Sequence, residues 1–378
     1  MRESQRRLAS EESSMVGLKR SGNGRVRVEL LDGEHITIDL DRKSRGADLV
    51  DSVCESLDIL EKDYFGLLHT QRGDPRVWID LDRRLSKTFR NEPWDVRLAV
   101  KFYPPEPSEL QDDVSRYQLS LAVRRDIIEG RLSCSPITYA LLASYVLQAE
   151  LGDRQSRVSV ATLSQHHAIP LHAVTDTTED NIDQLYRKHS GQTPADAEIN
   201  YLENATKLPM YGAEVHKAKD SEDIDIILAV SASGITILRD SIIMNRFPWT
   251  KILKISYNKR TYTLRLRASE FDEFETYLSF KLHSTRASKR LWRCSVEHHI
   301  FFRREMPVKV ERILGFPRLG SRRLSCRRTL RQLRTEPLRD NGEVKLGVSL
   351  RNLIRNEEIR SRTKITDIAW MIEKLKLQ

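Results

Sequence analysis

The segment that decides the fold is TYTLRLR at residues 261–267, in which polar and apolar side chains alternate at every position. Tyr262, Leu264 and Leu266 share one side of this segment, and the threonines and arginines between them share the other. A period of two residues is typical of a β-strand that buries one face. The segment therefore predicts a sheet with one face against a hydrophobic core and the other in water.

The same alternation recurs on both sides of this segment. Apolar residues alternate from Ile224 to Val230, before a turn at Ser231–Gly234, and again from Leu278 to Leu282. Ser284 is then placed to cap a long helix. The apolar side of that helix includes Ala287, Leu291, Cys294 and Phe302. Many strands closed by one C-terminal helix are typical of a pleckstrin-homology or phosphotyrosine-binding type of sandwich, which we assign to residues 207–303.

Upstream of Met210-Tyr211-Gly212 the apolar period is helical, and residues 108–206 are predicted to form an all-helical lobe with a looser stretch near 153–178. Ser108 and Gln111 fit a capping box for its first helix. Ser135-Pro136 and Thr193-Pro194 each provide a capping side chain followed by proline in the first turn.

Residues 25–104 are predicted to form a ubiquitin-like β-grasp lobe. Alternating residues on both sides of Asp32-Gly33 predict a hairpin. A helical pattern over residues 47–57 and three further strands follow. The lobe ends at Pro104-Pro105-Glu106-Pro107, whose prolines indicate a stiff linker.

The ends of the chain are polar, and their charge is uneven. Residues 1–24 are predicted to be a disordered lead, and residues 340–378 a mostly disordered tail with a short helix near Ile365–Leu377. Residues 303–339 hold twelve Arg or Lys and three acids. The net charge of this segment is therefore +9, which equals the net charge of the whole chain. The basic segment, assigned as 304–339, therefore accounts for the high pI. This weighs against a nucleic-acid-binding fold, although an arginine-rich nucleic-acid-binding protein stays open as an alternative.

The composition also bears on the class of protein. The sequence has no apolar run long enough for a spanning helix and no secretory signal, so a cytoplasmic protein with reduced cysteines is expected. Cys54 and Cys294 fit buried positions in helices. There is no phosphate-binding glycine loop or GxSxG motif, and the pairs His166-His167 and His298-His299 lack metal-ligand spacing. We expect no enzymatic activity, no metal and no cofactor.

Several longer stretches resemble the FERM domain of the band 4.1 and coracle family. They include Arg124–Leu132, Ala140–Gly152 and Gly191–Ala195 in the helical lobe, and RFPW at 246–249 followed by KILKISY at 251–257. The resemblance covers about residues 25–303. It implies a multi-lobe α+β fold: a ubiquitin-like β-grasp, an acyl-CoA-binding-protein-like helical bundle and a PH/PTB-like sandwich with a C-terminal helix, followed here by the basic tail. It also implies a non-enzymatic adaptor between membrane proteins and the cortical cytoskeleton.

The resemblance further implies binding of phosphoinositides by basic residues of the first and third lobes. The matching positions are Arg83, Arg84, Lys259, Arg260, Lys289 and Arg290. Lysine and arginine suit anionic headgroups, because each basic residue near an anionic membrane contributes about 1 kcal/mol to binding.

Protein partners are implied as well. The family binds cytoplasmic tails of transmembrane proteins, which can add as a strand beside the last helix of the sandwich, and membrane-associated guanylate-kinase scaffolds. Residues 60–64 resemble a family segment implicated in binding an anion exchanger, which makes Glu61, Asp63 and Tyr64 partner-binding candidates. Lys62 replaces a second acid of the usual segment. A FERM fragment that only binds receptor tails is a further alternative.

A regulatory segment commonly follows the sandwich in this family. Residues 319–329 keep its outline but lose its aromatic residues, and Arg322-Arg323-Leu324-Ser325 fits a basophilic kinase site. Phosphorylation of Ser325 would place about two negative charges among these arginines. Calmodulin, and spectrin with actin, are partners by family inference. The expected locations are the cytoplasm, the cytoskeleton and the inner face of the plasma membrane or cell junctions.

Overall fold

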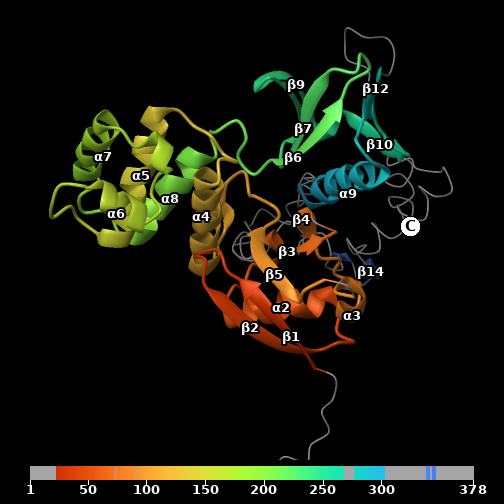
Figure 1. Cartoon of the computed structure of the whole chain (residues 1–378), viewed down its shortest axis with the longest axis horizontal. Helices are drawn as coiled ribbons and strands as arrows, with labels where there is room; N and C mark the ends of the chain where they lie inside the picture. The colour runs from red at the N-terminus through yellow and green to blue at the C-terminus, as the bar shows by residue number, and fades with distance from the viewer. Residues whose placement is uncertain are drawn as a thin grey trace, which may run out of the picture. The chain divides into compact units, whose positions relative to one another are not determined.

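The computed structural model describes residues 23–72, 74–90, 92–267 and 276–302, together with the short segments 338–340 and 343–345. The chain forms two compact units (Figure 1). One comprises the chain up to Leu57 together with Gly66–Ala99, and the other comprises Asp58–Phe65 together with the chain from Val100 onward. Most of the predicted lead, the greater part of the basic segment with Ser325, and the helix predicted near Ile365–Leu377 lie outside the described residues.

The first unit is built on a five-stranded sheet of order β2-β1-β5-β3-β4. The strands are β1 (Asn23–Glu29), β2 (His35–Asp41), β3 (Phe65–Gln71), β4 (Asp74–Trp78) and β5 (Asp95–Val100), and the helices are α2 (Gly46–Ser56) and α3 (Leu85–Thr88). Strands β1 and β2 are the predicted hairpin, and β1 pairs in parallel with β5 at the centre of the sheet. This arrangement confirms the predicted β-grasp.

The second unit contains a helical lobe. Its helices are α4 (Asp113–Ile128), α5 (Pro136–Leu151), α6 (Val160–Gln165), α7 (Asp176–Lys188) and α8 (Pro194–Ala205). Ser135 and Thr193 cap α5 and α8 as predicted. The predicted capping box at Ser108 and Gln111 is wrong, because Asp112 caps α4 by accepting hydrogen bonds from the N–H groups of Val114 and Ser115. Among the described residues, no helix is long and apolar enough to cross a membrane.

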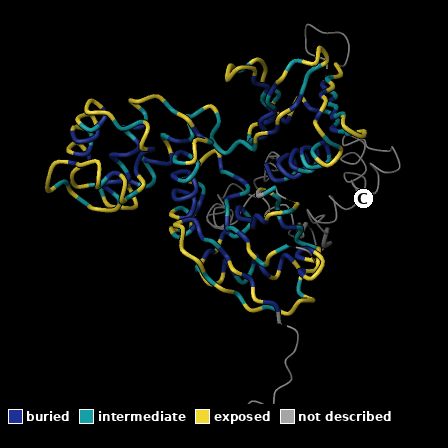
Figure 2. Tube along the Cα trace, viewed as in Figure 1, coloured by how far each residue is buried: buried dark blue, intermediate teal, exposed yellow. Residues whose placement is uncertain are grey.

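The second unit also contains a seven-stranded antiparallel sheet of order β10-β11-β12-β6-β7-β8-β9. Its strands are β6 (Glu214–Lys219), β7 (Asp225–Ser231), β8 (Gly234–Arg239), β9 (Ile242–Pro248), β10 (Ile252–Asn258), β11 (Thr261–Leu266) and β12 (Thr276–Lys281). Helix α9 (Thr285–Phe302) buries its apolar side against this sheet (Figure 2). Tyr262, Leu264 and Leu266 all lie in that core, as the alternation of TYTLRLR predicts. Two short strands, β13 (Leu338–Asp340) and β14 (Glu343–Lys345), pair separately.

The segment Asp58–Phe65 belongs to the second unit because its polar and aromatic groups pack there. Glu61 is 5 % exposed, and its Oε2 accepts hydrogen bonds from the backbone N–H groups of Gln111 and Asp112 at 3.1 and 3.3 Å. Tyr64 meets Phe301 of α9 edge to face, with 5.2 Å between ring centroids. These contacts join the segment to the beginning of α4 and to the end of α9.

Helix α9 is held by a buried ion cluster as well as by apolar packing. The carboxylate of Glu297 lies 2.7 Å from Lys101 Nζ and 3.0 Å from Arg293 Nε. The Glu297 side chain is 5 % exposed. Burial alone would raise the pKa of Glu297, but the charges and hydrogen bonds of Lys101 and Arg293 outweigh burial and lower it. Next to this cluster Phe102 stacks on Phe301, with ring centroids 4.1 Å apart.

Replacing Glu297 by glutamine should lower the free energy of unfolding by about 3 kcal/mol at pH 7, because Lys101 and Arg293 then lack their buried counter-ion. The Glu297 pKa lies below its ordinary value of 4.5, so the stabilisation is present above that pH and is lost as the pH falls through the folded-state pKa. Urea unfolding of both chains at pH 7 and at a pH below 4.5 should show the difference shrink. Asp225→Asn is the control, because its side chain is 90 % exposed. A difference that stays constant with pH would contradict the role of the ion cluster.

Replacing Glu61 by glutamine should leave the free energy of unfolding within about 1 kcal/mol, because one amide oxygen can accept both N–H groups that Oε2 accepts. Burial raises the pKa of Glu61, so its ionised form costs stability and a neutral amide removes that cost. Glu61→Ala should lower the free energy of unfolding by about 1–3 kcal/mol, because it leaves both N–H groups without an acceptor. Denaturant unfolding at neutral pH measures both variants, and equal losses for the two would show that the hydrogen bonds do not matter.

Candidate functional site

Strand β10 lies at one edge of the seven-stranded sheet, beside α9 (Figure 1). Among the described residues it pairs only with β11. Trp292 of α9 donates a hydrogen bond from Nε1 to the carbonyl oxygen of Ile255 at 3.3 Å, and the Tyr257 ring lies 5.5 Å from the Trp292 ring. A strand edge beside a helix is a place where an extended peptide can add as a further strand.

The side chains of β10 divide between core and surface. Ile252 and Ile255 are buried in the core, whereas Lys254, Ser256 and Tyr257 are half-buried. Trp292 is fully buried, so its hydrogen bond fixes the distance between β10 and the helix. The edge therefore combines a rigid support with side chains that a bound peptide could contact.

Two predicted lipid-binding residues form the tip of the hairpin that follows β10. Asn258 pairs with Thr261, so Lys259 and Arg260 alone make the turn. Both side chains are exposed. Lys259 has a φ of +52°, a left-handed conformation that lysine rarely adopts and that two-residue hairpins favour. The hairpin thus holds two adjacent cations at its tip in spite of a backbone cost.

The other predicted lipid-binding residues have different surroundings. Lys289 and Arg290 are half-buried on α9, and Arg290 Nε lies 3.8 Å from Glu214 Oε1, so its charge is partly offset. Arg83 and Arg84 are exposed near the start of α3, where Arg83 Nη2 donates to the carbonyl oxygen of Lys87 at 2.9 Å. They belong to the first unit, and the four other residues belong to the second. Four of the predicted lipid-binding residues lie in the second unit. Of these four, Lys259 and Arg260 are adjacent and are the more exposed pair.

The predicted partner-binding residues are mostly interior. Glu61 and Tyr64 are buried in the contacts described above, and Asp63 is half-buried. Leu60, which precedes them, is 73 % exposed. A partner of this segment would therefore contact Leu60 and Asp63 more readily than Glu61 or Tyr64, and the partner-binding role stays a prediction.

Sequence periodicity did not identify β10 as a strand, and the structure gives the reason. The pairing of β10 with β11 shifts register between Ile252 and Lys254. Such a bulge breaks the alternation of inward and outward side chains on which the sequence prediction depends. The only sequence signal for this edge was the family-like segment KILKISY.

Comparison with protein families agrees with this architecture. The FERM N-terminal domain matches residues 28–91, the FERM central domain matches residues 105–216, and the FERM C-terminal PH-like domain matches residues 220–310. The three matches follow one another in the order of the three predicted lobes.

Individual proteins are similar over most of the chain. The Protein 4.1 homolog of Drosophila melanogaster is 48 % identical over 298 residues, which are 78 % of this chain and 17 % of that protein. Band 4.1-like protein 3 of Homo sapiens is 44 % identical over 318 residues, 84 % of this chain and 29 % of that protein. The chain thus spans less than a third of the length of these two curated relatives.

A solved structure shares the fold. The FERM domain of Drosophila Merlin, in complex with its C-terminal domain, has a TM-score of 0.65 and 22 % sequence identity, and the match covers 74 % of this chain and 96 % of that chain. The three domain matches and the identity to band 4.1 proteins establish the family. The chain belongs to the FERM-domain proteins of the band 4.1 family.

Proposed function

We propose that this chain is a non-enzymatic adaptor that joins cytoplasmic tails of transmembrane proteins, and membranes rich in phosphoinositides, to the cortical cytoskeleton. The observation that carries the proposal is the edge strand β10 beside α9, with the cations Lys259 and Arg260 at the end of the same hairpin. A tail that adds to β10 extends from a protein embedded in the membrane, so the bound strand would lie near anionic lipid headgroups. A basic surface beside β10 suits those headgroups.

The binding edge has the properties that strand addition requires. Its backbone is available on the side away from β11 within the described residues, apart from the Ile255 carbonyl oxygen that accepts from Trp292. Main-chain hydrogen bonds to an edge strand supply affinity, and side-chain contacts supply specificity. Tyr257 and Lys254 are half-buried there and offer an aromatic surface and a cation.

The cytoskeletal end of the adaptor is proposed from the family. The chain matches only 17 % and 29 % of the two relatives described above, so a spectrin–actin contact belongs to the proposal for the whole protein. Scaffolds of the membrane-associated guanylate-kinase class, calmodulin, and control through Ser325 are part of the same proposal. The expected location is the inner face of the plasma membrane or cell junctions.

The lipid part can be tested by removing the charges of the hairpin tip without disturbing its turn. Lys259→Asn keeps a residue that tolerates a left-handed conformation, and Arg260→Ser removes the second cation. Co-sedimentation of the full chain with phosphoinositide vesicles should weaken about 30-fold in the double variant, given about 1 kcal/mol per basic residue. Arg83→Gln with Arg84→Gln tests the first unit in the same assay. Unchanged binding in both double variants would reject these lobe residues as the lipid site.

The tail-binding part of the proposal can be tested by substituting Tyr257 of β10, whose ring lies beside Trp292 of α9. Tyr257→Ala should weaken binding of immobilised tail peptides from single-span membrane proteins by about tenfold or more, because the aromatic surface that Tyr257 offers to the peptide is lost. Tyr277→Ala is a matched control, since that tyrosine lies on β12 and is 61 % exposed. Circular dichroism shows whether both variants stay folded. Equal binding by the two variants would move the tail site away from β10.

A further inference from the structure

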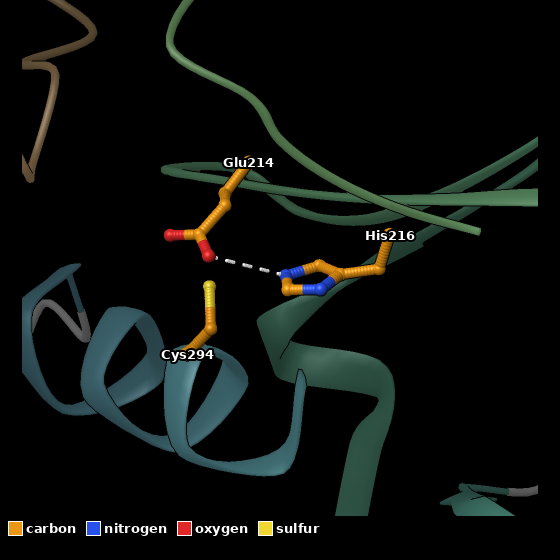
Figure 3. Close-up of side chains that lie close together, drawn as sticks. All are labelled: Glu214, His216 and Cys294. Atoms are coloured by element: carbon orange, nitrogen blue, oxygen red, sulfur yellow. Dashed lines mark ion pairs between the residues drawn. The ribbon is translucent and has the colours of Figure 1, made fainter. Parts of the chain in front are cut away.

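Three side chains with metal-binding atoms meet between β6 and α9 (Figure 3). Glu214 and His216 come from β6, and Cys294 comes from α9. Their carboxylate oxygen, ring nitrogen and sulfur atoms all lie within 4.8 Å of one another. Figure 3 shows the Cys294 thiol pointing toward the same edge of the Glu214 carboxylate that faces the His216 ring.

The fold explains why these residues converge. Glu214 and His216 are two positions apart on a strand, so both side chains leave the same face of the sheet. That face is the one covered by α9, where Cys294 is buried with the core residues. The adjacent pairs His166-His167 and His298-His299 cannot share a face in this way. The sequence spacing of 78 residues between His216 and Cys294 hides the cluster until the lobe is folded.

The histidine is the second observation that points to a ligand. Its side chain is 7 % exposed, and its Nε2 has no hydrogen-bond partner among the described residues. That nitrogen lies 3.4 Å from Glu214 Oε1. A buried polar nitrogen that makes no hydrogen bond costs about 1–3 kcal/mol, and a metal ion bound at this nitrogen would remove that cost.

The spacing suits a tetrahedral zinc ion. Two ligands that each lie about 2.1 Å from such an ion are separated by about 3.4 Å, which is the separation of Glu214 Oε1 and His216 Nε2. Closing the remaining separations, which are at most 4.8 Å, requires shifts of about 1 Å by the Cys294 side chain. Thiolate, imidazole and carboxylate together favour zinc over magnesium or calcium, which prefer oxygen ligands.

We propose that Glu214, His216 and Cys294 bind a zinc ion that links strand β6 to helix α9. The fourth position belongs to water, which can enter from the side of Glu214, whose side chain is 13 % exposed. Thiolate and carboxylate each carry one negative charge, so together they balance the two positive charges of the ion. The ion and its three protein ligands would therefore carry no net charge between them. The ion would join two elements of one core.

Two neighbouring groups compete with the ion. Arg290 Nε lies 3.8 Å from the same oxygen of Glu214 that faces His216, so its charge competes with the ion for that oxygen. Burial, followed by the charges of Glu214 and Glu297, raises the pKa of the Cys294 thiol. Zinc therefore has to displace a proton from sulfur as it binds.

The experiment uses the full chain without a histidine tag, with cobalt(II) as a spectroscopic substitute for zinc. The wild-type chain should bind one cobalt ion with a thiolate-to-cobalt charge-transfer band, and zinc should displace it. Cys294→Ser should lose the band, and His216→Gln should bind cobalt on the order of 100-fold more weakly. Cys134→Ser is the matched control, because Cys134 is a half-buried cysteine of the helical lobe and should leave the band unchanged.

Arg290→Gln separates a metal site from a merely hydrogen-bonded cluster. Removing the competing cation should strengthen cobalt binding severalfold. If the Arg290 ion pair is what holds the three side chains together, cobalt binding should weaken instead. The proposal is overturned if the wild-type chain shows no charge-transfer band, or if the band persists in Cys294→Ser, which would place the ion on another cysteine. The wild-type spectrum decides the matter even if a variant fails to fold.

Discussion

The arrangement of the second unit depends on one buried carboxylate. Glu297 lies inside the protein, where an ionised group is stable only beside opposite charge. Lys101, in the segment that follows β5, and Arg293, one turn earlier on α9, supply that charge. Arg293 lies on the same helix as Glu297, so the ion pair with Lys101 is the one that ties α9 to another part of the unit. Phe102, the residue after Lys101, stacks on Phe301 of the same helix.

Helix α9 then transmits its position to the rest of the lobe through its other faces. Trp292 reaches the carbonyl oxygen of Ile255 and sets the distance to the edge strand β10. Cys294 points toward β6 and brings its sulfur close to Glu214 and His216. A single helix thus positions the proposed tail-binding edge and the proposed zinc site. A shift of α9 along its axis would disturb both proposed sites, because Trp292 and Cys294 lie on the same helix.

Charged residues proved harder to interpret from the sequence than apolar ones. Lys259 and Arg260 are as exposed as a membrane-binding role requires, but Arg290 faces Glu214. Glu61 belongs to a family-like segment and yet caps backbone N–H groups in the interior. A charged side chain can be solvated, paired or buried with a partner, and these outcomes depend on groups far away in the sequence.

The sequence by itself determined the lobes and their order, because alternation and helical periods record which face of each element is buried. It placed Tyr262, Leu264 and Leu266 in the core and found the caps of α5 and α8. Local patterns could not reveal the bulge in β10. The cap of α4 at Asp112 was within reach of the sequence, because aspartate favours the N-cap, but the prediction placed the cap at Ser108. The meetings of Glu297 with Lys101, and of Cys294 with His216, were decided by the tertiary structure alone. They join residues that are distant along the chain, and only the packing of α9 against the sheet and the Lys101 segment brings their atoms within reach.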